Sequence, residues 1–394
     1  MAKSDDTKSD DTIGNERLLS IDVFRGIAIT AMILVNNPGS WSHIYAPLKH
    51  AEWHGWTPTD MIFPFFLFIV GVSAALSGAR QQNTDKLDRL KAGAVRSLKL
   101  FGLGLFIALF WYDFYGSDYN WWSDRVDNVR IMGVLQRIGL VYLFALPAII
   151  WLGWRGQLIY AVALLLIYQM LMYFVAYPDP SGEIFHNMWA AGHNVAAWLD
   201  YQIIGASHIW QTAPLPYGVE PEGLLTSLPA TATVISGALV GRLLLSDAAK
   251  RAQVIGFLFG GFGLVVVGQF ISQWIPINKA LWTGSYVLLS SGFAVVTLAL
   301  LIWVLDVKGY KRWSHPLVVF GANAIGLFVI SALIARLVIM IKINGVSIKS
   351  IAFEFVQAFG VSATNASLFY AILYLGLLYG LFHWLYRHQI IWKV

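Results

Sequence analysis

Apolar runs of about 20 residues, separated by short polar stretches, follow one another along most of the chain. A helix that crosses a bilayer needs roughly 20 mostly apolar residues, so each run has the length of one span. We expect spans near residues 20–37, 58–79, 93–112, 131–152, 157–176, 223–245, 252–273, 285–304, 315–338 and 365–388. The pattern therefore predicts an all-α, polytopic membrane bundle of about ten transmembrane helices.

Composition supports a lipid environment and narrows the possible chemistry. Hydrophobic residues make up 57% of the chain, charged residues 12%, and the mean hydropathy is +0.62, too apolar for a soluble protein of this size. The chain has no cysteine, which excludes disulfides, thiolate metal sites and a cysteine nucleophile. Its net charge of +5 is spread over short loops, so we expect no nucleic-acid partner.

Charge also predicts how the chain is oriented. Residues 1–19 are rich in Asp, Ser, Thr and Lys, which is typical of a disordered cytosolic tail, and we expect residues 20–394 to form one transmembrane domain. Lys and Arg favour the loops on the side of this tail about threefold, so both termini should be cytosolic. The loop region near 177–222 has several prolines and carboxylates but no Lys or Arg. It should lie outside, with a short interfacial helix at 195–204 that forms a lid.

Polar side chains inside the spans are candidates for function because burying them in lipid is costly. Asp22 and Arg25 lie three residues apart, so they either pair with each other or line a site. Asn36 ends the first span next to Asn37, and it either caps the helix or serves a site. Arg137 lies about two turns into the fourth span, where it faces an aqueous cavity or an anion, or else pairs with a carboxylate such as Asp60.

The loop between the first two spans, residues 49–58, contains several aromatic residues and two histidines. His50 and His54 have the spacing of a zinc pair, but Gly55 and Pro58 interrupt a helix and no third ligand is evident, so we expect no metal. A neutral imidazole can take a proton from an attacking amine or accept an acyl group itself. The alternative for His50 is a hydrogen-bonded surface residue.

Several blocks in the same order resemble the heparan-α-glucosaminide N-acetyltransferase family, and in particular bacterial NagX-like members associated with amino-sugar use. The blocks are SIDVFRG (20–26), VN (35–36), KHAEWHG (49–55), TPTDMIFPFFLFIVGVS (57–73), VRIMGVLQRIG (129–139), EPEGLL (220–225), PINKALWTGSYV (276–287) and IIWKV (390–394). The resemblance implies a homodimeric transmembrane enzyme of the bacterial inner membrane. Such an enzyme transfers acetyl from cytosolic acetyl-CoA to the amine of glucosamine, or of a glucosamine-containing saccharide, on the periplasmic side.

Carried over by position, the resemblance places the catalytic histidine at His50 and its neighbouring asparagine at Asn36. His50 would be the general base or an acetyl carrier. We further expect acetyl-CoA, the co-substrate, to contact Arg137, Arg25 and Asp60, and the amino sugar to contact Glu222, Asn278 and Lys279.

This sequence departs from the family pattern on the acceptor side. A glycine run is usual at Asn37–Ser40, asparagine at His54 and aspartate at Glu220. The identity of the acceptor therefore stays open. A transporter of amino sugars or peptidoglycan fragments, or an enzyme that acylates a lipid-linked glycan, would fit the same bundle.

Overall fold

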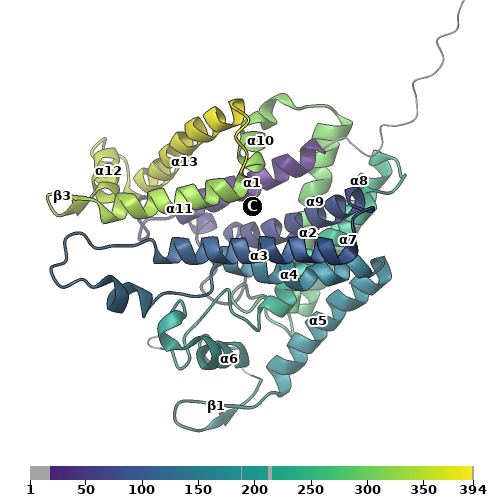
Figure 1. Cartoon of the computed structure of the whole chain (residues 1–394), viewed down its shortest axis with the longest axis horizontal. Coiled ribbons are helices and arrows are strands. Elements are labelled where there is room, and N and C mark those ends of the chain that lie inside the picture. Colours follow the sequence, from purple (N-terminus) through teal and green to yellow (C-terminus); the bar gives the residue numbers. More distant parts are fainter. Residues whose placement is uncertain (1–17, 188, 212–214, 393–394) are drawn as a thin grey trace, which may run out of the picture.

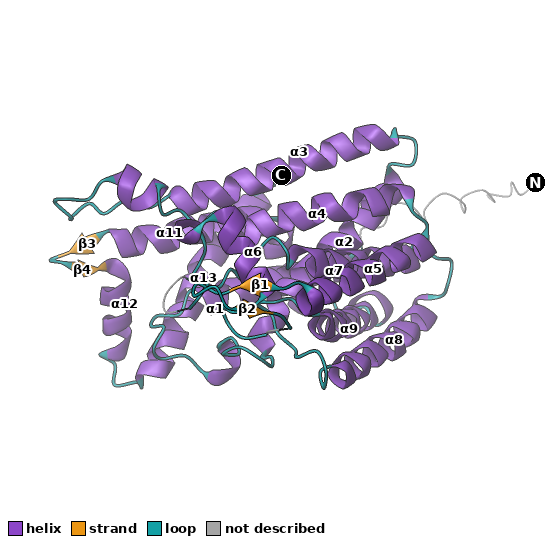
Figure 2. Cartoon of the chain, turned by 90° about the horizontal axis from the view of Figure 1, so that it is seen from below, coloured by secondary structure: helices purple, strands orange, loops and turns teal. Residues whose placement is uncertain are grey.

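The computed structural model describes residues 18–187, 189–211 and 215–392. Most of the predicted tail at residues 1–19 lies outside the described residues, and so do Lys393 and Val394. The described chain is a bundle of long helices with two-residue strands at its margins (Figures 1 and 2).

In the described residues, nine helical stretches are long and apolar enough to cross a membrane. They are α1 (Leu19–Asn36), η2 with α2 (Pro58–Arg80), α3 (Lys86–Leu109), α4 (Val134–Trp151), α5 (Trp154–Phe174), α7 (Ser227–Leu244), α8 (Lys250–Ile271), α9 with η5 (Gly284–Val307) and α13 (Ala363–Arg387). A further pair, α10 (His315–Ala322) and α11 (Ala324–Met340), occupies the predicted span 315–338. The prediction of an all-α bundle with about ten spans is therefore confirmed.

The predicted span at 315–338 is broken at Asn323, where α10 and α11 are bent by 73°. The side-chain amide of Asn323 donates to the carbonyl of Ile390 (3.0 Å), and its oxygen accepts from the N–H of Trp392 (2.8 Å). Asparagine competes with the helix backbone for hydrogen bonds. Here it holds the C-terminal segment against the bend, so the prediction of one continuous helix is wrong at this position.

Shorter elements lie at the ends of the spans. They are η1 (Ala46–Leu48), η2 (Pro58–Met61), η3 (Trp121–Val126), β1 (Tyr177–Pro178), β2 (Ile184–Phe185), α6 (Val195–Ile204), η4 (Ala206–His208), η5 (Ile302–Val307), η6 (Arg312–Ser314), β3 (Lys342–Ile343), β4 (Val346–Ser347) and α12 (Ile348–Gln357). β1 pairs antiparallel with β2, and β3 with β4. The short helix predicted at 195–204 is confirmed as α6, whereas the sequence analysis did not predict α12.

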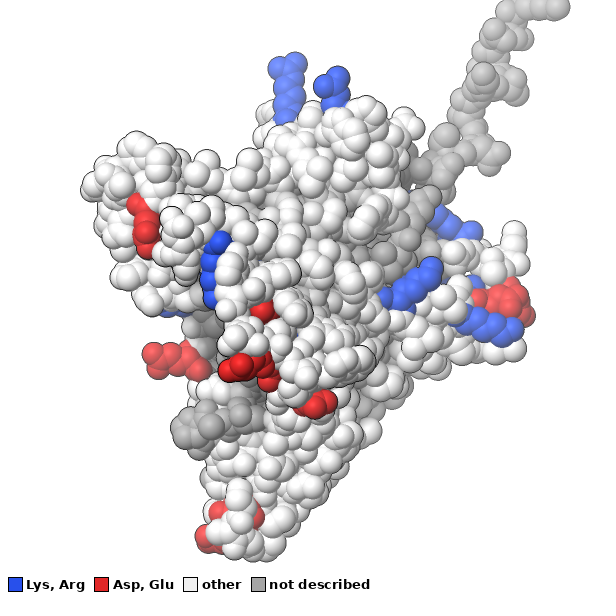
Figure 3. Space-filling view, turned by 60° about the vertical axis from the view of Figure 1, so that its left-hand side comes forward, with Lys and Arg blue, Asp and Glu red and all other residues white. Residues whose placement is uncertain are grey.

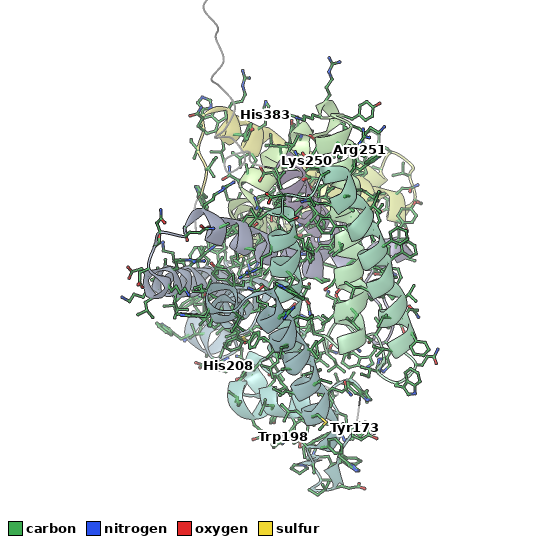
Figure 4. The ribbon with its side chains drawn as sticks, turned by 90° about the vertical axis from the view of Figure 1, so that its right-hand side faces the viewer. Tyr173, Trp198, His208, Lys250, Arg251 and His383 are labelled. Carbon is green, nitrogen blue, oxygen red and sulfur yellow. The ribbon has the colours of Figure 1, made fainter. Side chains whose placement is uncertain are left out.

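The bundle has two chemically different ends. We call the end where α1 begins the near end, and the end where α1 finishes at Asn36 the far end. Figure 4 shows Lys250 and Arg251, at the start of α8, at the near end at the top, and Tyr173, in the last turn of α5, at the far end at the bottom. On the face drawn in Figure 3, Lys and Arg gather mainly at the top and right, and most Asp and Glu at the left and bottom.

The core lies between closely packed helix pairs, α2 with α7, α8 with α9, and α3 with α4. Glycines permit the closest approach. A Cβ on Gly71 would lie 1.8 Å from the carbonyl oxygen of Val234, and one on Gly237 would lie 1.9 Å from that of Phe68. Small residues at helix contacts are the usual means of association in lipid. This packing fixes α2, whose first turn carries the site described next.

Candidate functional site

His50 and Asp60 form a hydrogen-bonded pair at the far end. The Nδ1 atom of His50 lies 2.6 Å from Oδ1 of Asp60, and the His50 side chain is 48% exposed whereas that of Asp60 is 2% exposed. A carboxylate can only accept at this position, so Nδ1 donates to it, and in the neutral imidazole the lone pair is then on Nε2. The pair therefore has the orientation that lets an imidazole act as a base or a nucleophile through Nε2.

The local sequence explains why Asp60 is held so firmly. Thr57 caps η2, Pro58 occupies the first position, and the Asp60 side chain returns to the cap in a capping box. Its Oδ2 accepts from the backbone N–H of Ala51 (3.0 Å) and of Thr57 (2.9 Å). The same carboxylate thus begins the helix, fixes the histidine loop and orients the imidazole.

Lys279 lies beside this pair, in the loop between α8 and α9. Its Nζ is 3.2 Å from both ring nitrogens of His50 and 3.9 Å from Oδ1 of Asp60. Burial lowers the pKa of Lys279, although the charges of Glu222 and Asp60 oppose that shift. The ammonium is placed to donate to the free Nε2, or to neutralise negative charge that develops on a group reacting there.

Asn278 holds the Lys279 loop in place. It is fully buried, its amide donates to the carbonyl of Trp53 (2.9 Å), and its oxygen accepts from the N–H of Leu281 (2.9 Å). Both ends of the Asn278 amide thus have hydrogen-bond partners within the protein. This geometry supports a role in positioning the Lys279 loop, in place of the predicted contact with the amino sugar. Burial also lowers the pKa of His54, whose Nδ1 lies 3.4 Å from the Asn278 amide.

A second charged cluster adjoins the first. Nε of Arg130 lies 2.9 Å from Glu220, and its Nη2 contacts both Glu220 and Glu222. Burial opposes ionisation of Glu222, but the charges of Arg130, Arg137 and Lys279 outweigh it and lower the pKa of Glu222. Burial raises the pKa of Glu220. Charges of alternating sign thus run from Arg130 through Glu222 and Lys279 to Asp60, the partner of His50.

Two cavities lie along the bundle towards this cluster. The near cavity has a volume of about 350 Å³ and is lined by residues that include Arg25, Arg96, Tyr142 and Trp392. The far cavity has a volume of about 440 Å³. Its polar lining residues include Asn36, Arg125, Arg130, Gln136 and Arg336.

The same helices line both cavities, about one turn apart. On α3 the near cavity is lined by Leu100 and the far cavity by Gly104, and on α11 the corresponding residues are Ile325 and Phe328. A separation of three or four residues corresponds to about 5 Å along a helix. The two cavities therefore lie nearly end to end, with a partition about one helical turn thick between them.

The residues predicted to contact acetyl-CoA lie in different surroundings. Arg25 lines the near cavity and also contacts Asp22 (3.1 Å) and Ser73 (2.9 Å), so it both pairs and lines a site. Arg137 is fully buried, lies 5.1 Å from the centre of the Trp282 ring and is absent from the lining of either cavity, in contrast to its neighbour Gln136.

The proposed ion pair between Arg137 and Asp60 is wrong. Arg137 donates to the carbonyl of Gly223 (3.0 Å) and to the hydroxyl of Thr226, whereas Asp60 serves His50 and its own cap. Arg137 and Asp60 thus both have partners within the protein, and their contact with acetyl-CoA stays a prediction.

Asn36 and His50 both lie towards the far end, but in different surroundings. Asn36 lines the far cavity, whereas His50 is absent from its lining and lies with Lys279 and Asp60. Arg130 connects the two places, because it lines the far cavity and pairs with Glu222. Within the described residues, no group of three or more His, Asp or Glu side chains could hold a metal ion.

Sequence reasoning missed three arginines that line these cavities, Arg96, Arg125 and Arg336. Arg336 lies within an apolar run, where a charge is costly, so the rule applied to Arg137 would have found it. Arg96 and Arg125 lie at positions typical of ordinary loop or helix-end cations, and nothing in the sequence distinguishes them.

A bundle of this kind, with a histidine–carboxylate pair at one end of a line of cavities, defines a polytopic membrane protein built around a polar reaction or transport site. A family model described as heparan-alpha-glucosaminide N-acetyltransferase, catalytic, matches residues 17–257. The chain belongs to this family, which confirms the resemblance read from the sequence blocks.

Two relatives carry the name heparan-alpha-glucosaminide N-acetyltransferase. The human protein is 31% identical over 360 residues, which cover 79% of this chain and 52% of the relative. The mouse protein is 29% identical over 359 residues, which cover 79% of this chain and 53% of the relative. The chain thus spans about half the length of the curated relatives it matches.

Proposed function

We propose that this protein transfers an acetyl group from acetyl-CoA, bound from the near end, to the amine of glucosamine or a glucosamine-containing saccharide at the far end. The observation that carries the proposal is the His50–Asp60 pair with Lys279 beside it, close to the end of a line of two cavities. The names of the human and mouse relatives support acetyl transfer to such an amine.

The near cavity suits the nucleotide end of the donor. Arg25 and Arg96 line it, and the Nε of Arg96 is buried without a hydrogen-bond partner among the described residues. Phosphate groups are strong acceptors for such guanidinium donors. Because the hydrocarbon core is about 30 Å thick, the acetyl-bearing arm would extend through the partition into the far cavity.

At the far end, His50 acts through Nε2 by one of two routes. In the direct route, the amine nitrogen bonds to the thioester carbon, the carbon–sulfur bond breaks, and His50 takes the amine proton and passes it to the departing thiolate. In the two-step route, Nε2 bonds to the thioester carbon as the carbon–sulfur bond breaks and the thiolate leaves. The amine nitrogen then bonds to the acetyl carbon, the bond from that carbon to Nε2 breaks, and the released Nε2 takes the amine proton. Asp60 fixes the ring in both routes.

The remaining polar residues have roles that follow from their positions. Asn36, on the wall of the far cavity, donates to the thioester oxygen as it becomes negative, and Lys279 neutralises the charge next to His50. Glu222, although paired with Arg130, adds negative charge that attracts an ammonium group. We therefore keep Lys279 and Glu222 as residues proposed to contact the acceptor.

The membrane assignment follows from the charged ends. We place the near end in the cytosol and the far end in the periplasm of a bacterial inner membrane, because Arg80, Lys86, Lys250 and Arg251 lie at the near ends of α2, α3 and α8. The exposed apolar surfaces of α5, α8 and α13 provide room for lipid and for the second subunit of a homodimer.

The chemistry is tested with purified protein, labelled acetyl-CoA and glucosamine. Wild type should form labelled N-acetylglucosamine, and His50→Ala should lose at least about 10³-fold in rate. The matched control is His43→Ala, which removes an exposed histidine from the same interhelical loop. If His50→Ala transfers acetyl as fast as the control, the proposal fails. If wild type moves labelled sugar across liposomes without acetyl-CoA, the transporter alternative replaces it.

A further inference from the structure

A third cavity, which we call the side cavity, lies at the far end beside the proposed reaction site. It has a volume of about 390 Å³, and α11, α12 and the loops that follow α1 and α3 contribute its walls. The two spaces adjoin, because the side cavity shares five lining residues with the far cavity: Asn36, Asn37, Arg125, Ala335 and Arg336. A ligand in the side cavity would therefore lie next to the far cavity, where the donor's acetyl group is proposed to arrive.

Three cations line the side cavity, Arg125 from η3, Arg336 from α11 and Lys349 from α12. In the described part of the chain, no Asp or Glu forms an ion pair with any of them, whereas Arg130 of the far cavity is neutralised by two glutamates. Arg125 donates to the carbonyl of Ala108, and its buried Nε has no hydrogen-bond partner among the described residues.

Two of these cations, Arg125 and Arg336, are also close enough to disfavour each other. The charge of Arg125 acts repulsively on Arg336, whose guanidinium makes a long 3.5 Å contact with the carbonyl of Ala332. Burial lowers the pKa of Lys349 and of Arg125, which means that their charged forms lack compensation in the protein alone. A half-buried group of like charges is stabilised when an anion binds among them.

Aromatic rings complete the walls. Trp41, Trp111 and Tyr370 line the same cavity, and Nζ of Lys349 lies 5.9 Å from the centre of the Trp41 ring. Flat rings next to cations suit a saccharide that carries an acidic group, because the ring packs on the apolar face of the sugar while the cation holds the acid.

We propose that the side cavity binds an oxyanion, a phosphate, sulfate or carboxylate group, between Arg125, Arg336 and Lys349, and that the acceptor saccharide carries it. The anion site itself does not depend on the proposed function. That the acceptor saccharide is the molecule that carries the oxyanion does rest on the proposed function. The phosphate of an anionic lipid headgroup has the same chemistry and is the other source that the experiment distinguishes.

The test uses the full-length protein in nanodiscs of uncharged phosphatidylcholine, without acetyl-CoA. Titration calorimetry compares glucosamine 6-phosphate with glucosamine. We expect the phosphorylated sugar to bind at least about tenfold more tightly, which corresponds to about 1.4 kcal/mol. Lys349→Gln and Arg336→Gln should each reduce that ratio. The matched control is Lys342→Gln, because Lys342 lies in the neighbouring hairpin but already faces Asp113 at 3.9 Å.

Lys349 is the safer variant because it lies in the first turn of the short helix α12, outside the spans. In a second arm, phosphatidylglycerol replaces part of the lipid and the thermal unfolding temperature is measured. If wild type is stabilised by the lipid but does not prefer the sugar phosphate, and Lys349→Gln abolishes the stabilisation, the anion site is supported and its ligand is the lipid headgroup. If neither the sugar phosphate nor the lipid distinguishes wild type from Lys349→Gln and Arg336→Gln, the proposal is overturned.

Because binding is measured without the donor, this outcome does not depend on acetyl transfer. If wild type prefers the phosphorylated sugar but does not transfer acetyl, the proposed function is contradicted and the anion site is still supported. The reverse result, transfer without that preference, would contradict the anion site alone.

Discussion

His50 and Asp60 are joined by a 2.6 Å contact between Nδ1 and Oδ1, although one lies in a half-exposed loop and the other in the buried first turn of a span. Because Asp60 is fixed at the start of a helix, this contact also restrains the His50 side chain in its loop. It also leaves Nε2 as the free basic atom. The chemistry proposed for the far end therefore depends on a carboxylate whose first structural task is to cap η2.

Replacing Asp60 with asparagine tests this dependence. Asp60→Asn can donate to the imidazole and stabilise the wrong tautomer, so we expect the rate of acetyl transfer to fall by about 10² to 10⁴-fold. The rate is compared with that of the double variant Asp60→Asn/His50→Ala. Because Asp60 acts through His50, the double variant should be no slower than His50→Ala. Additive losses would contradict this account.

Asn36 is expected to act on the transition state and not on substrate binding. Asn36→Ala should lower kcat by about 10² to 10³-fold while the KM for acetyl-CoA changes little, because the hydrogen bond strengthens only when the carbonyl oxygen becomes negative. Asn37→Ala is the matched control, since the Asn37 amide already donates to the carbonyl of Ile33 (2.8 Å). Equal losses in the two variants would show that Asn36 only ends its helix.

Arg130 is expected to be essential for stability. Arg130→Met leaves Glu220 and Glu222 buried without their counterion, which should destabilise the protein by about 3 to 5 kcal/mol. Thermal unfolding in detergent measures the loss. Adding Glu222→Gln to Arg130→Met should recover part of it, because one of the stranded charges is removed. No recovery in the double variant would mean that the guanidinium acts by packing alone.

Asp200 predicts a dependence of stability on pH. Burial raises its pKa to about 7 from an ordinary value of 3.8. The folded protein therefore holds a proton that the unfolded chain has released, so the contribution of Asp200 to stability falls as pH rises from about 4 to 7. Asp200→Asn should stabilise the protein by up to a few kcal/mol at pH 8 and change little near pH 4.

Thermal unfolding at the two pH values provides the measurement for Asp200. Glu183→Gln, an exposed carboxylate in the same far-end layer, is the control and should show little difference at either pH. A stabilisation by Asp200→Asn that is as large at pH 4 as at pH 8 would contradict the assignment of the proton to Asp200.

The spans could be predicted from sequence because the thickness of the bilayer fixes the length of an apolar run. The break at Asn323 could not, because it depends on Ile390 and Trp392, which lie far away in the sequence. Asn323 alone is one polar residue in an apolar run, and nothing near it marks a bend.

The site was predictable in part. The roles that the chemistry and the family resemblance give to His50 and Asn36 remain predictions, and the structure places Lys279 beside His50. The alternative pairing of Arg137 with Asp60 was wrong, and sequence alone could not place this side chain because successive residues on a helix point about 100° apart. The polar side chain that lines the cavity is that of its neighbour Gln136, and sequence alone does not fix the rotation of α4 to that accuracy.

The central claim is that an acetyl group bound at the near end reaches an amine at the far end. Proteoliposomes with uniformly oriented protein and labelled acetyl-CoA supplied only on the near side, with glucosamine only on the far side, test it most directly. Labelled N-acetylglucosamine should accumulate on the far side while CoA stays on the near side. Product that forms only when both substrates share one side would contradict the account.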